Sequence, residues 1–496
     1  MERQGGRCWR LVLVPFPLQG HISPMLQLGT ILHSRGFSIT IAHTTNLGSP
    51  DASKHPDFVF LPLSSDDSSS TTESKDSDDF IVFVSDLNLN HRASLQEQLT
   101  EMVEKREQHE ELPCIVYDTN MYSAETVARH LKLPSIMLCT SSASSMIAYY
   151  AYPQLLEEGC ISLQGPESEE LVPGLHPLRF KDLPVFDFKN PDTLLQLEAS
   201  LLALSQKWLQ LPPEEDHSCI TWLDKQTDNS VIYVSFGSIS SLDEKELAEI
   251  AWSLANSKQP FLWVVRPGSV GGSESIDVLL SDDFKGTVGE RGCIVKWAPQ
   301  KEVLAHRAVG GFWSHCGWNS TLESISEGGP LICRPFFADQ RVNARYISRE
   351  WRVGIDLEND LKRVEIERAI KMLMLGKEGQ EMRQRATHLK TKAGLCIKEG
   401  GSSFNSLNKL VELIILAEGD HNCITWLNKQ TENSAYASFG SIRILDENEL
   451  AEIAWCLANS KQPFLWVLRP GSVHDQILLI YCPMISEMVL EKTAAK

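Results

Sequence analysis

The sequence predicts an α/β protein made of two domains, each built around a parallel sheet. Two stretches support this prediction, because residues 11–43 and residues 292–334 each read as alternating strands and helices. The chain has 496 residues, of which 42% are hydrophobic and 22% are charged. That composition is typical of globular proteins, and the length is too great for one ordinary hydrophobic core.

The first stretch places a histidine beside a strand end. Residues 11–16 (LVLVPF) predict a buried strand, a turn follows, and His21 then begins a helix that leads to a second strand at residues 37–43. Residues 114–118 (CIVYD) predict a further strand that ends in Asp118. The carboxyl ends of parallel strands border the ligand crevice of an open sheet, so we expect both side chains at that edge.

Together, His21 and Asp118 predict acid–base chemistry. The positive end of a helix dipole favours the neutral imidazole of His21, which is then available as a base. Asp118 could orient the ring and stabilise its charged form. A histidine in a crevice is often only structural, so the pair is a stronger signal than either residue alone.

Residues 292–340 form the most informative segment. Strands are predicted at 292–297 and 309–314, with a short helix at 302–306 between them. The turn HCGWNS at 315–320 then leads into a helix. The N-terminus of a helix after such a turn presents free N–H groups and a positive dipole, so it could hold a diphosphate without a metal.

Several residues of this segment also have simpler structural explanations. Ser320 and Glu323 have the spacing of a capping box, which by itself needs no ligand. Trp297 and Trp313 could be core aromatics, and His306 fits a structural role. The combination at this spacing, followed by a strand at 331–334 and then by an Asp-Gln pair, favours a binding site.

Residues 297–340 resemble, without a gap, the signature box of plant family-1 UDP-glycosyltransferases. The resemblance extends over about the first 415 residues. It implies the glycosyltransferase B architecture, in which two Rossmann-like domains face each other across a cleft. The first domain would bind the acceptor and the second the UDP-sugar.

The resemblance also implies roles for individual residues. Uracil would stack on Trp297 and bond to Ala298, and the ribose would bind Gln300 and Glu323. The diphosphate would bind Ser238, His315, Asn319 and Ser320. The sugar would bind Trp318, Asp339 and Gln340, and Gly317 would belong to the same UDP-sugar site. His21 and Asp118 would form the catalytic dyad. His21 would deprotonate an acceptor hydroxyl, which attacks the anomeric carbon and displaces UDP with inversion.

Composition excludes several classes of partner. The net charge of −19, from 46 basic and 65 acidic residues, argues against nucleic acid and anionic membranes. The 12 cysteines are scattered without a CxxC pair, which is typical of a reduced, cytoplasmic protein. No signal peptide or membrane span is predicted. We expect a monomer with no metal and no cofactor, since UDP-sugar is a co-substrate.

The C-terminal part of the chain repeats an earlier segment. Residues 438–473 match residues 235–270 at 31 of 36 positions, and residues 420–434 match 216–230 at 12 of 15. The strand at residues 231–234 is reduced to Ala435, Tyr436 and Ala437 in the copy. A single strand–helix–strand unit cannot bury its own apolar faces, so we expect residues after Ala417 to be loosely packed or to pair with an exposed edge. Ser441 should not substitute for Ser238.

The region between the two domains is short by comparison with the resembling family. Residues 194–211 predict one helix, and Pro212 and Pro213 then lead directly to the second domain. The predicted organisation is an acceptor-binding domain at 1–212, a UDP-sugar-binding domain at 213–417, a partial duplicate at 418–473 and an unrelated tail at 474–496. Both irregularities suggest a mis-joined gene model or a decayed tandem duplicate.

The function that the sequence favours is transfer of glucose from UDP-glucose to a hydroxyl of a small plant metabolite. Trp318 and Gln340 resemble the glucose-using members of the family. One alternative is a non-catalytic sugar-nucleotide binder or pseudoenzyme, which the shortened region favours. A Rossmann dehydrogenase is disfavoured, because no GxGxxG follows a first strand with an acidic residue downstream.

Overall fold

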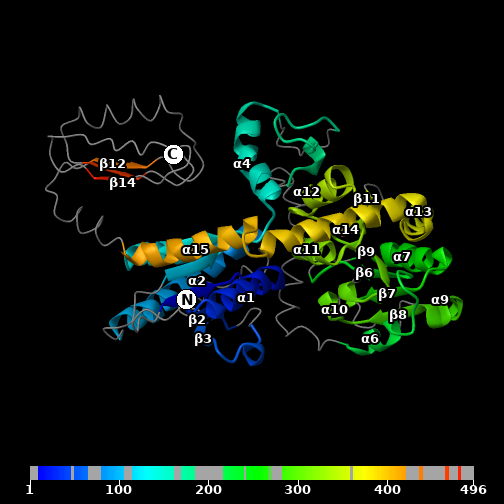
Figure 1. Cartoon of the computed structure of the whole chain (residues 1–496), viewed down its shortest axis with the longest axis horizontal. Coiled ribbons are helices and arrows are strands. Elements are labelled where there is room, and N and C mark those ends of the chain that lie inside the picture. The colour runs from blue at the N-terminus through cyan, green and yellow to red at the C-terminus, as the bar shows by residue number, and fades with distance from the viewer. Residues whose placement is uncertain are drawn as a thin grey trace. The chain divides into compact units, whose positions relative to one another are not determined.

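A computed structural model describes residues 9–45, 50–64, 80–105, 114–160, 169–184, 216–238, 242–266, 269, 282–357, 361–419, 435–438, 464–467 and 479–481. The chain divides into two compact units, Met1–Val411 and Glu412–Lys496. The first unit contains two parallel sheets with their helices, and the second contains a small sheet of its own (Figure 1). The expected fold class, with two parallel-sheet α/β domains, is confirmed.

The N-terminal sheet has five parallel strands in the order β3-β2-β1-β4-β5. Its strands are β1 (Arg10–Val14), β2 (Ser38–Thr44), β3 (Val59–Leu63), β4 (Cys114–Asp118) and β5 (Ser135–Leu138). The associated helices are α1 (Gln19–Ser34), η1 (Ala52–Lys54), α2 (Phe80–Glu104), α3 (Ser123–His130), α4 (Ala143–Glu157) and η3 (Phe180–Asp182). The strand order reverses between β1 and β4, and such a switch point is where open sheets bind ligands.

The second sheet has six parallel strands in the order β11-β10-β9-β6-β7-β8. Its strands are β6 (Val231–Ser235), β7 (Phe261–Val264), β8 (Gly292–Val295), β9 (Val309–Ser314), β10 (Leu331–Cys333) and β11 (Gly354–Asp356). The helices are α6 (Ser218–Leu223), α7 (Glu244–Ser257), α9 (Asp282–Val288), η4 (Gly289–Arg291), α10 (Gln300–Ala305), α11 (Trp318–Glu327), α12 (Gln340–Arg345), the π-helix η5 (Tyr346–Glu350), α13 (Arg363–Leu375), α14 (Lys377–Ile397) and α15 (Ser402–Gly419). Here the order reverses between β6 and β9.

The central strand β6 is apolar from Val231 to Val234 because both of its faces are buried. Val231 and Tyr233 belong to the core cluster on one face of the sheet, and Ile232 and Val234 belong to the cluster on the other. Successive side chains of a strand point to opposite faces, and a parallel sheet is covered by helices on both. A strand buried on both sides must therefore be apolar throughout rather than alternating.

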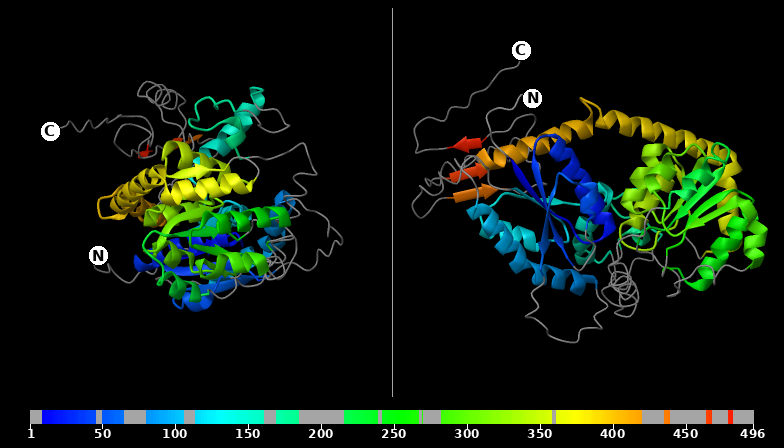
Figure 2. Two further views of the ribbon diagram at one scale, coloured as in Figure 1. Left: turned by 90° about the vertical axis from the view of Figure 1, so that its right-hand side faces the viewer. Right: turned by 90° about the horizontal axis from the view of Figure 1, so that it is seen from below.

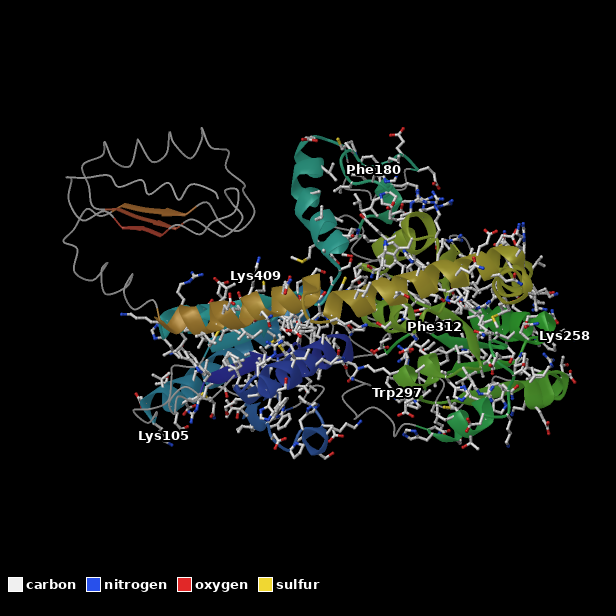
Figure 3. All side chains as sticks on the ribbon, in the orientation of Figure 1. Lys105, Phe180, Lys258, Trp297, Phe312 and Lys409 are labelled. Carbon is white, nitrogen blue, oxygen red and sulfur yellow. The ribbon has the colours of Figure 1, made fainter. Side chains whose placement is uncertain are left out.

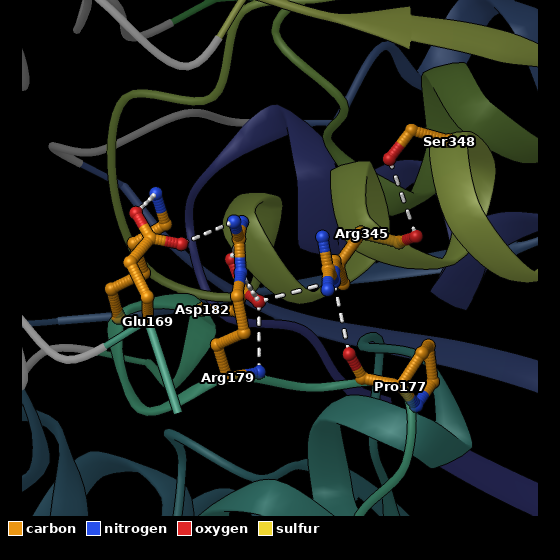
Figure 4. Close-up of polar contacts among 7 residues, drawn as sticks. Glu169, Pro177, Arg179, Asp182, Arg345 and Ser348 are labelled. Atoms are coloured by element: carbon orange, nitrogen blue, oxygen red, sulfur yellow. Dashed lines mark hydrogen bonds and ion pairs between the residues drawn. The ribbon is translucent and has the colours of Figure 1, made fainter. Parts of the chain in front are cut away.

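The two halves of the first unit meet at a buried group of charges (Figure 4). Arg345 of α12 donates from Nε to the carbonyl oxygen of Pro177 at 2.9 Å and lies 3.3 Å from Asp182 Oδ2. Asp182 also accepts from Arg179 Nη2 at 2.8 Å. Removal of one member would leave a buried charge without its partner, so this contact fixes α12 against the N-terminal half.

The helix α15 connects the end of the second sheet domain back to the first (Figure 2). Arg35 of α1 donates from Nη1 to Asn408 Oδ1 at 2.7 Å, and its guanidinium lies 5.5 Å from the ring centroid of Phe404. None of the helices in the described residues is long and apolar enough for a membrane span.

The repeated segment forms its own sheet rather than joining an existing edge. β12 (Ala435–Ser438) pairs in parallel with β13 (Phe464–Val467), and β14 (Leu479–Tyr481) pairs antiparallel with β13. Ala435 faces Phe464, just as Ile232 faces Phe261 in the original, so the copy keeps the parental register. The third strand of this sheet, β14, lies in the tail at 474–496.

One other sequence expectation, the helix at 194–211 in the shortened region, falls on residues outside the described ranges. The proposed domain boundary at 212 lies in the same undescribed segment. These remain predictions.

A chain that ends at Ala417 should keep the fold and the nucleotide site of the first unit. The truncation retains Phe404 and Asn408, which hold α15 against α1, and removes the repeat entirely. Calorimetric titration of UDP should therefore give the same affinity for the truncated and full-length chains, and the truncated chain should be more soluble. Loss of UDP binding on truncation would show instead that the repeat is a working part of the fold.

Candidate active site

The switch point of the first sheet brings His21 and Asp118 together. β1 and β4 are neighbours, and the chain leaves β1 through a short turn into α1, where His21 is the third residue. Asp118 is the last residue of β4 and is fully buried. His21 Nδ1 lies 2.8 Å from Asp118 Oδ2, so the predicted pairing of this base and carboxylate is present in the structure.

The contacts of the His21 ring determine its protonation pattern. A carboxylate can only accept a hydrogen bond, so Nδ1 of His21 must carry the proton and donate to Asp118. Thr140 Oγ1 lies 3.0 Å from the same Nδ1, and the Phe16 ring packs edge-on against the imidazole at 5.1 Å. Nε2 is then the unprotonated nitrogen, and His21 retains a quarter of its side-chain exposure to meet a substrate.

Sequence reasoning missed Thr140. It follows β5, which is the next strand after β4 at the same sheet edge. The strand-end argument that selected Asp118 could also have found it, because parallel strands end side by side.

The switch point of the second sheet places His315 between two glycines. Ser235 of β6 pairs with Ser314 of β9, so the turns that follow these strands lie together. A Cβ atom at Gly237 would lie 2.5 Å from His315 Nε2, and one at Gly317 would lie 2.4 Å away. Gly237 also has φ +77°, where L residues are strained. Both positions therefore need glycine if His315 is to keep its place.

Burial and a neighbouring cation keep His315 neutral. Burial, together with the charge of Arg266, lowers the pKa of His315 to about 4. Its Nδ1 is buried and has no hydrogen-bond partner among the described residues. Arg266, whose pKa burial lowers to about 9, donates from Nη1 to the carbonyl oxygen of Ser238 at 2.7 Å. This arginine follows β7 and was not singled out from the sequence.

The helix after this turn is not capped as the sequence suggested. α11 begins at Trp318, its N-cap is Gly317, and no side chain caps it. The capping-box expectation for Ser320 and Glu323 was therefore wrong. Gln300 Nε2 donates to Ser320 Oγ at 2.9 Å and to Glu323 Oε2 at 2.7 Å, so both side chains turn towards α10. The uncapped N-terminus of α11 keeps the character of an anion site.

The tryptophans of this segment differ in burial. Trp313 is fully buried, as the core interpretation required. Trp297 is only partly exposed, beside the buried Ala298. Figure 3 shows Phe312, also fully buried, inside the second sheet domain and Trp297 at its margin. Trp318 is likewise partly exposed and packs near Trp351, with ring centroids 6.4 Å apart.

Asp339 and Gln340 lie at the start of α12. Gln340 Oε1 accepts from the backbone N–H groups of Phe336 and Phe337, which orders the loop after β10. Asp339 Oδ2 accepts from Asn343 Nδ2 at 3.0 Å. Burial raises the pKa of Asp339, and both the Asn343 hydrogen bond and the nearby His21 oppose that rise. The charge of Asp339 is thus coupled to His21 of the N-terminal half.

A direct hydrogen bond joins the two switch points. Asn319 Nδ2 in the first turn of α11 donates to the carbonyl oxygen of Gly20 at 2.9 Å, immediately before His21. Cys316 is a buried free thiol in the core of the second sheet domain. In the described residues, no three His, Cys, Asp or Glu side chains gather as a metal site.

Comparison with known proteins identifies the family. The model for UDP-glucoronosyl and UDP-glucosyl transferases matches residues 206–390. UDP-glycosyltransferase 76E1 of Arabidopsis thaliana is 43% identical over 444 residues, with 81% of this chain and 96% of the relative covered. The chain belongs to the plant family-1 UDP-glycosyltransferases. Flavonol 3-O-glucosyltransferase UGT76E12 of the same plant is 44% identical over 455 residues, with 82% of this chain and 96% of that protein covered.

Solved structures of similar enzymes share the fold. Phytolacca americana UGT2, complexed with UDP-2fluoro-glucose and pterostilbene, has a TM-score of 0.67 and 27% identity and covers 82% of this chain and 100% of its own. A UDP-glucosyltransferase from Polygonum tinctorium, described as capable of glucosylating indoxyl, has a TM-score of 0.68 and 27% identity, with 83% and 99% covered. Both agree with the glycosyltransferase B architecture expected from the sequence.

Replacement of Gly317 by Ala should weaken UDP binding by displacing His315. Loss of one charge-assisted hydrogen bond costs about 1.5–3 kcal/mol, or roughly ten- to a hundredfold in Kd. Calorimetric titration of the Gly317→Ala enzyme with UDP measures this loss. Gly286→Ala is the matched control, because a Cβ there meets nothing within 4 Å. Equal affinity in both variants would show that His315 does not contact the nucleotide.

Replacement of Trp297 by Ala should remove a stacking face for uracil. Base–aromatic stacks contribute about 1–3 kcal/mol each, so UDP affinity should fall roughly five- to 150-fold. Trp222→Ala removes another partly buried tryptophan of the same domain and should leave UDP affinity unchanged. If the Trp297→Ala enzyme bound UDP as tightly as the wild type, Trp297 would have only a packing role.

Proposed function

We propose that this enzyme transfers glucose from UDP-glucose to a hydroxyl of a small plant metabolite, with inversion at the anomeric carbon. The observation that carries the proposal is the His21–Asp118 pair, held next to the uncapped N-terminus of α11 by the Asn319–Gly20 hydrogen bond. A base and a diphosphate-binding helix end thus meet within one site. The relatives named as glucosyltransferases support glucose as the transferred sugar.

His21 supplies the base in this proposal. Its Nε2 takes the proton from the acceptor hydroxyl while the acceptor oxygen forms a bond to the anomeric carbon. The bond from that carbon to the diphosphate oxygen breaks, and its electron pair leaves with UDP. Asp118 accepts from Nδ1, so it fixes the ring and stabilises the imidazolium that forms. A single displacement of this kind inverts the anomeric configuration.

The donor would be held by the second sheet domain. The N–H groups at the start of α11 and the Nδ1 of His315 suit phosphate oxygens, because no described side chain caps the helix and no described residue bonds to that nitrogen. The Gln300–Glu323 pair suits the ribose hydroxyls, and Trp297 suits the uracil face. Asp339 and Gln340, with Trp318, would contact the sugar close to His21.

These helix-end and side-chain donors could neutralise a departing diphosphate, so we propose that the reaction needs neither metal nor cofactor. A monomer is proposed because all the site residues lie in one unit of one chain. The cytoplasm is proposed as the compartment, which is supported by the free cysteines of the described residues.

Replacement of His21 by Ala should abolish transfer while leaving UDP affinity nearly unchanged, because His21 belongs to the acceptor side. General-base catalysis contributes about 10²- to 10⁴-fold, which sets the expected fall in kcat. Asp118→Asn should lower kcat by less, since an amide can still accept from Nδ1. Turnover with UDP-glucose and a panel of phenolic acceptors, together with UDP titration, measures both effects.

His33→Ala is the control, because this exposed histidine lies at the far end of the same helix α1. Normal turnover of the His21→Ala enzyme would rule out the general-base role. A wild-type chain that binds UDP but neither transfers nor hydrolyses UDP-glucose would favour the alternative of a non-catalytic binder.

A further inference from the structure

Asn343 of α12 is a buried residue that makes three side-chain hydrogen bonds to separate parts of the site. Its Nδ2 donates to Asp339 Oδ2 at 3.0 Å and to the carbonyl oxygen of Cys316 at 3.1 Å. Its Oδ1 accepts from Ser142 Oγ at 3.1 Å. One amide therefore touches the sugar-side carboxylate, the turn before α11 and the acceptor half of the enzyme.

Of the two groups to which Asn343 donates, one lies at a strained backbone position and the other lies next to one. Cys316 has φ +63°, and Ala338, which immediately precedes Asp339, has φ +53°. Residues other than glycine rarely adopt these values and keep them only where the surroundings hold them. The two hydrogen bonds donated by Asn343 are a direct source of that restraint.

The acceptor-side contact leads back to the catalytic base. Ser142 Oγ accepts from the backbone N–H of Ser145 in the first turn of α4, so it can donate to Asn343 while Ser145 Oγ donates to it. Two residues earlier, Thr140 lies 3.0 Å from His21 Nδ1. A short continuous path thus links the base to the carboxylate of Asp339.

We infer that Asn343 is a positioning residue that sets Asp339 and the 315–320 turn against the acceptor half of the site. This inference rests on the proposed function, in which Asp339 holds the transferred sugar. Asn343 contacts no part of the Trp297, Gln300 and Glu323 set among the bonds described. Its loss should therefore affect recognition of the sugar more than recognition of the nucleotide.

Titration of the Asn343→Ala enzyme with UDP and with UDP-glucose tests this selectivity. Small misplacements of positioning groups cost up to about a hundredfold, so we expect UDP-glucose affinity to fall about tenfold or more and UDP affinity by less than about threefold. The value of kcat/KM for UDP-glucose should fall by about the same factor as the affinity for UDP-glucose. Ser253→Ala is the matched control, because this fully buried serine also donates to two carbonyl oxygens, far from the site residues, in α7 and at Arg363.

The pH profile gives a second readout that a purely structural role would not move. His21, Tyr149 and Asn343 face Asp339 from α1, α4 and α12. Loss of the Asn343 donor should raise the pKa of Asp339 further. The acidic limb of kcat/KM in Asn343→Ala should then move to higher pH. In Asn343→Asp, the new carboxyl group and that of Asp339 can share one proton. The value of kcat/KM should therefore fall as rising pH removes the shared proton.

Equal weakening of UDP and UDP-glucose in Asn343→Ala, with a pH profile parallel to that of the wild type, would overturn the inference. The inference would also be overturned if Asn343→Ala lowered the free energy of unfolding as much as Ser253→Ala does and changed nothing else. A wild-type chain that binds neither nucleotide would overturn both this inference and the proposed function. If the wild type bound UDP-glucose without transferring it, only catalysis would be refuted, because the ratio of the two affinities still tests Asn343.

Discussion

Parallel strand pairing at two switch points is the constraint on which the site depends. The pairing of β1 with β4 places the start of α1 beside the end of β4, and so His21 meets Asp118. The pairing of β6 with β9 places the Gly237 turn against His315 in the same way. Among the described strands, each sheet places its candidate site residues at the point where its strand order reverses.

The site is made of groups that local structure leaves unsatisfied. Within the part of the chain that the structure describes, α11 has no side-chain cap and His315 has a buried nitrogen without a hydrogen-bond partner. Cys316 and Ala338 have left-handed backbone conformations. Each of these is unfavourable in isolation, and residues such as Ser320 and Glu323 could in principle have capped the helix. They bond to Gln300 instead, which builds a polar surface between α10 and α11. The N-terminus of α11 therefore lacks the stabilisation of a side-chain cap, which is the condition that the proposed diphosphate site requires.

Strand bounds and the residues at strand ends could be predicted from the sequence, because both follow from local patterns. β4 and β9 have the predicted bounds because each is a short apolar run with clear punctuation, and His21 and Asp118 follow from the strand-end rule. The orientation of Ser320 was not predictable from spacing, because a cap and a contact to Gln300 use the same residue types. Arg266 and Asn343 were missed because they contact partners distant in the chain. Thr140 was also missed, although the strand-end rule could have found it. The region at 185–215 and the roles of the UDP-sugar residues remain predictions.

The repeat shows that a sequence motif can be copied without the neighbouring strands that surround it in the original. The copy retains the SFGS turn of the original, and its strands β12 and β13 keep the register of β6 and β7. In the original, however, the turn after β6 packs against His315, which directly follows the neighbouring strand β9. The tail at 474–496 contains no HCGWNS turn, and the third strand that it supplies pairs with β13 rather than with β12. Two strands of the copy can therefore keep the parental register without the neighbouring strand that places the parental turn against His315.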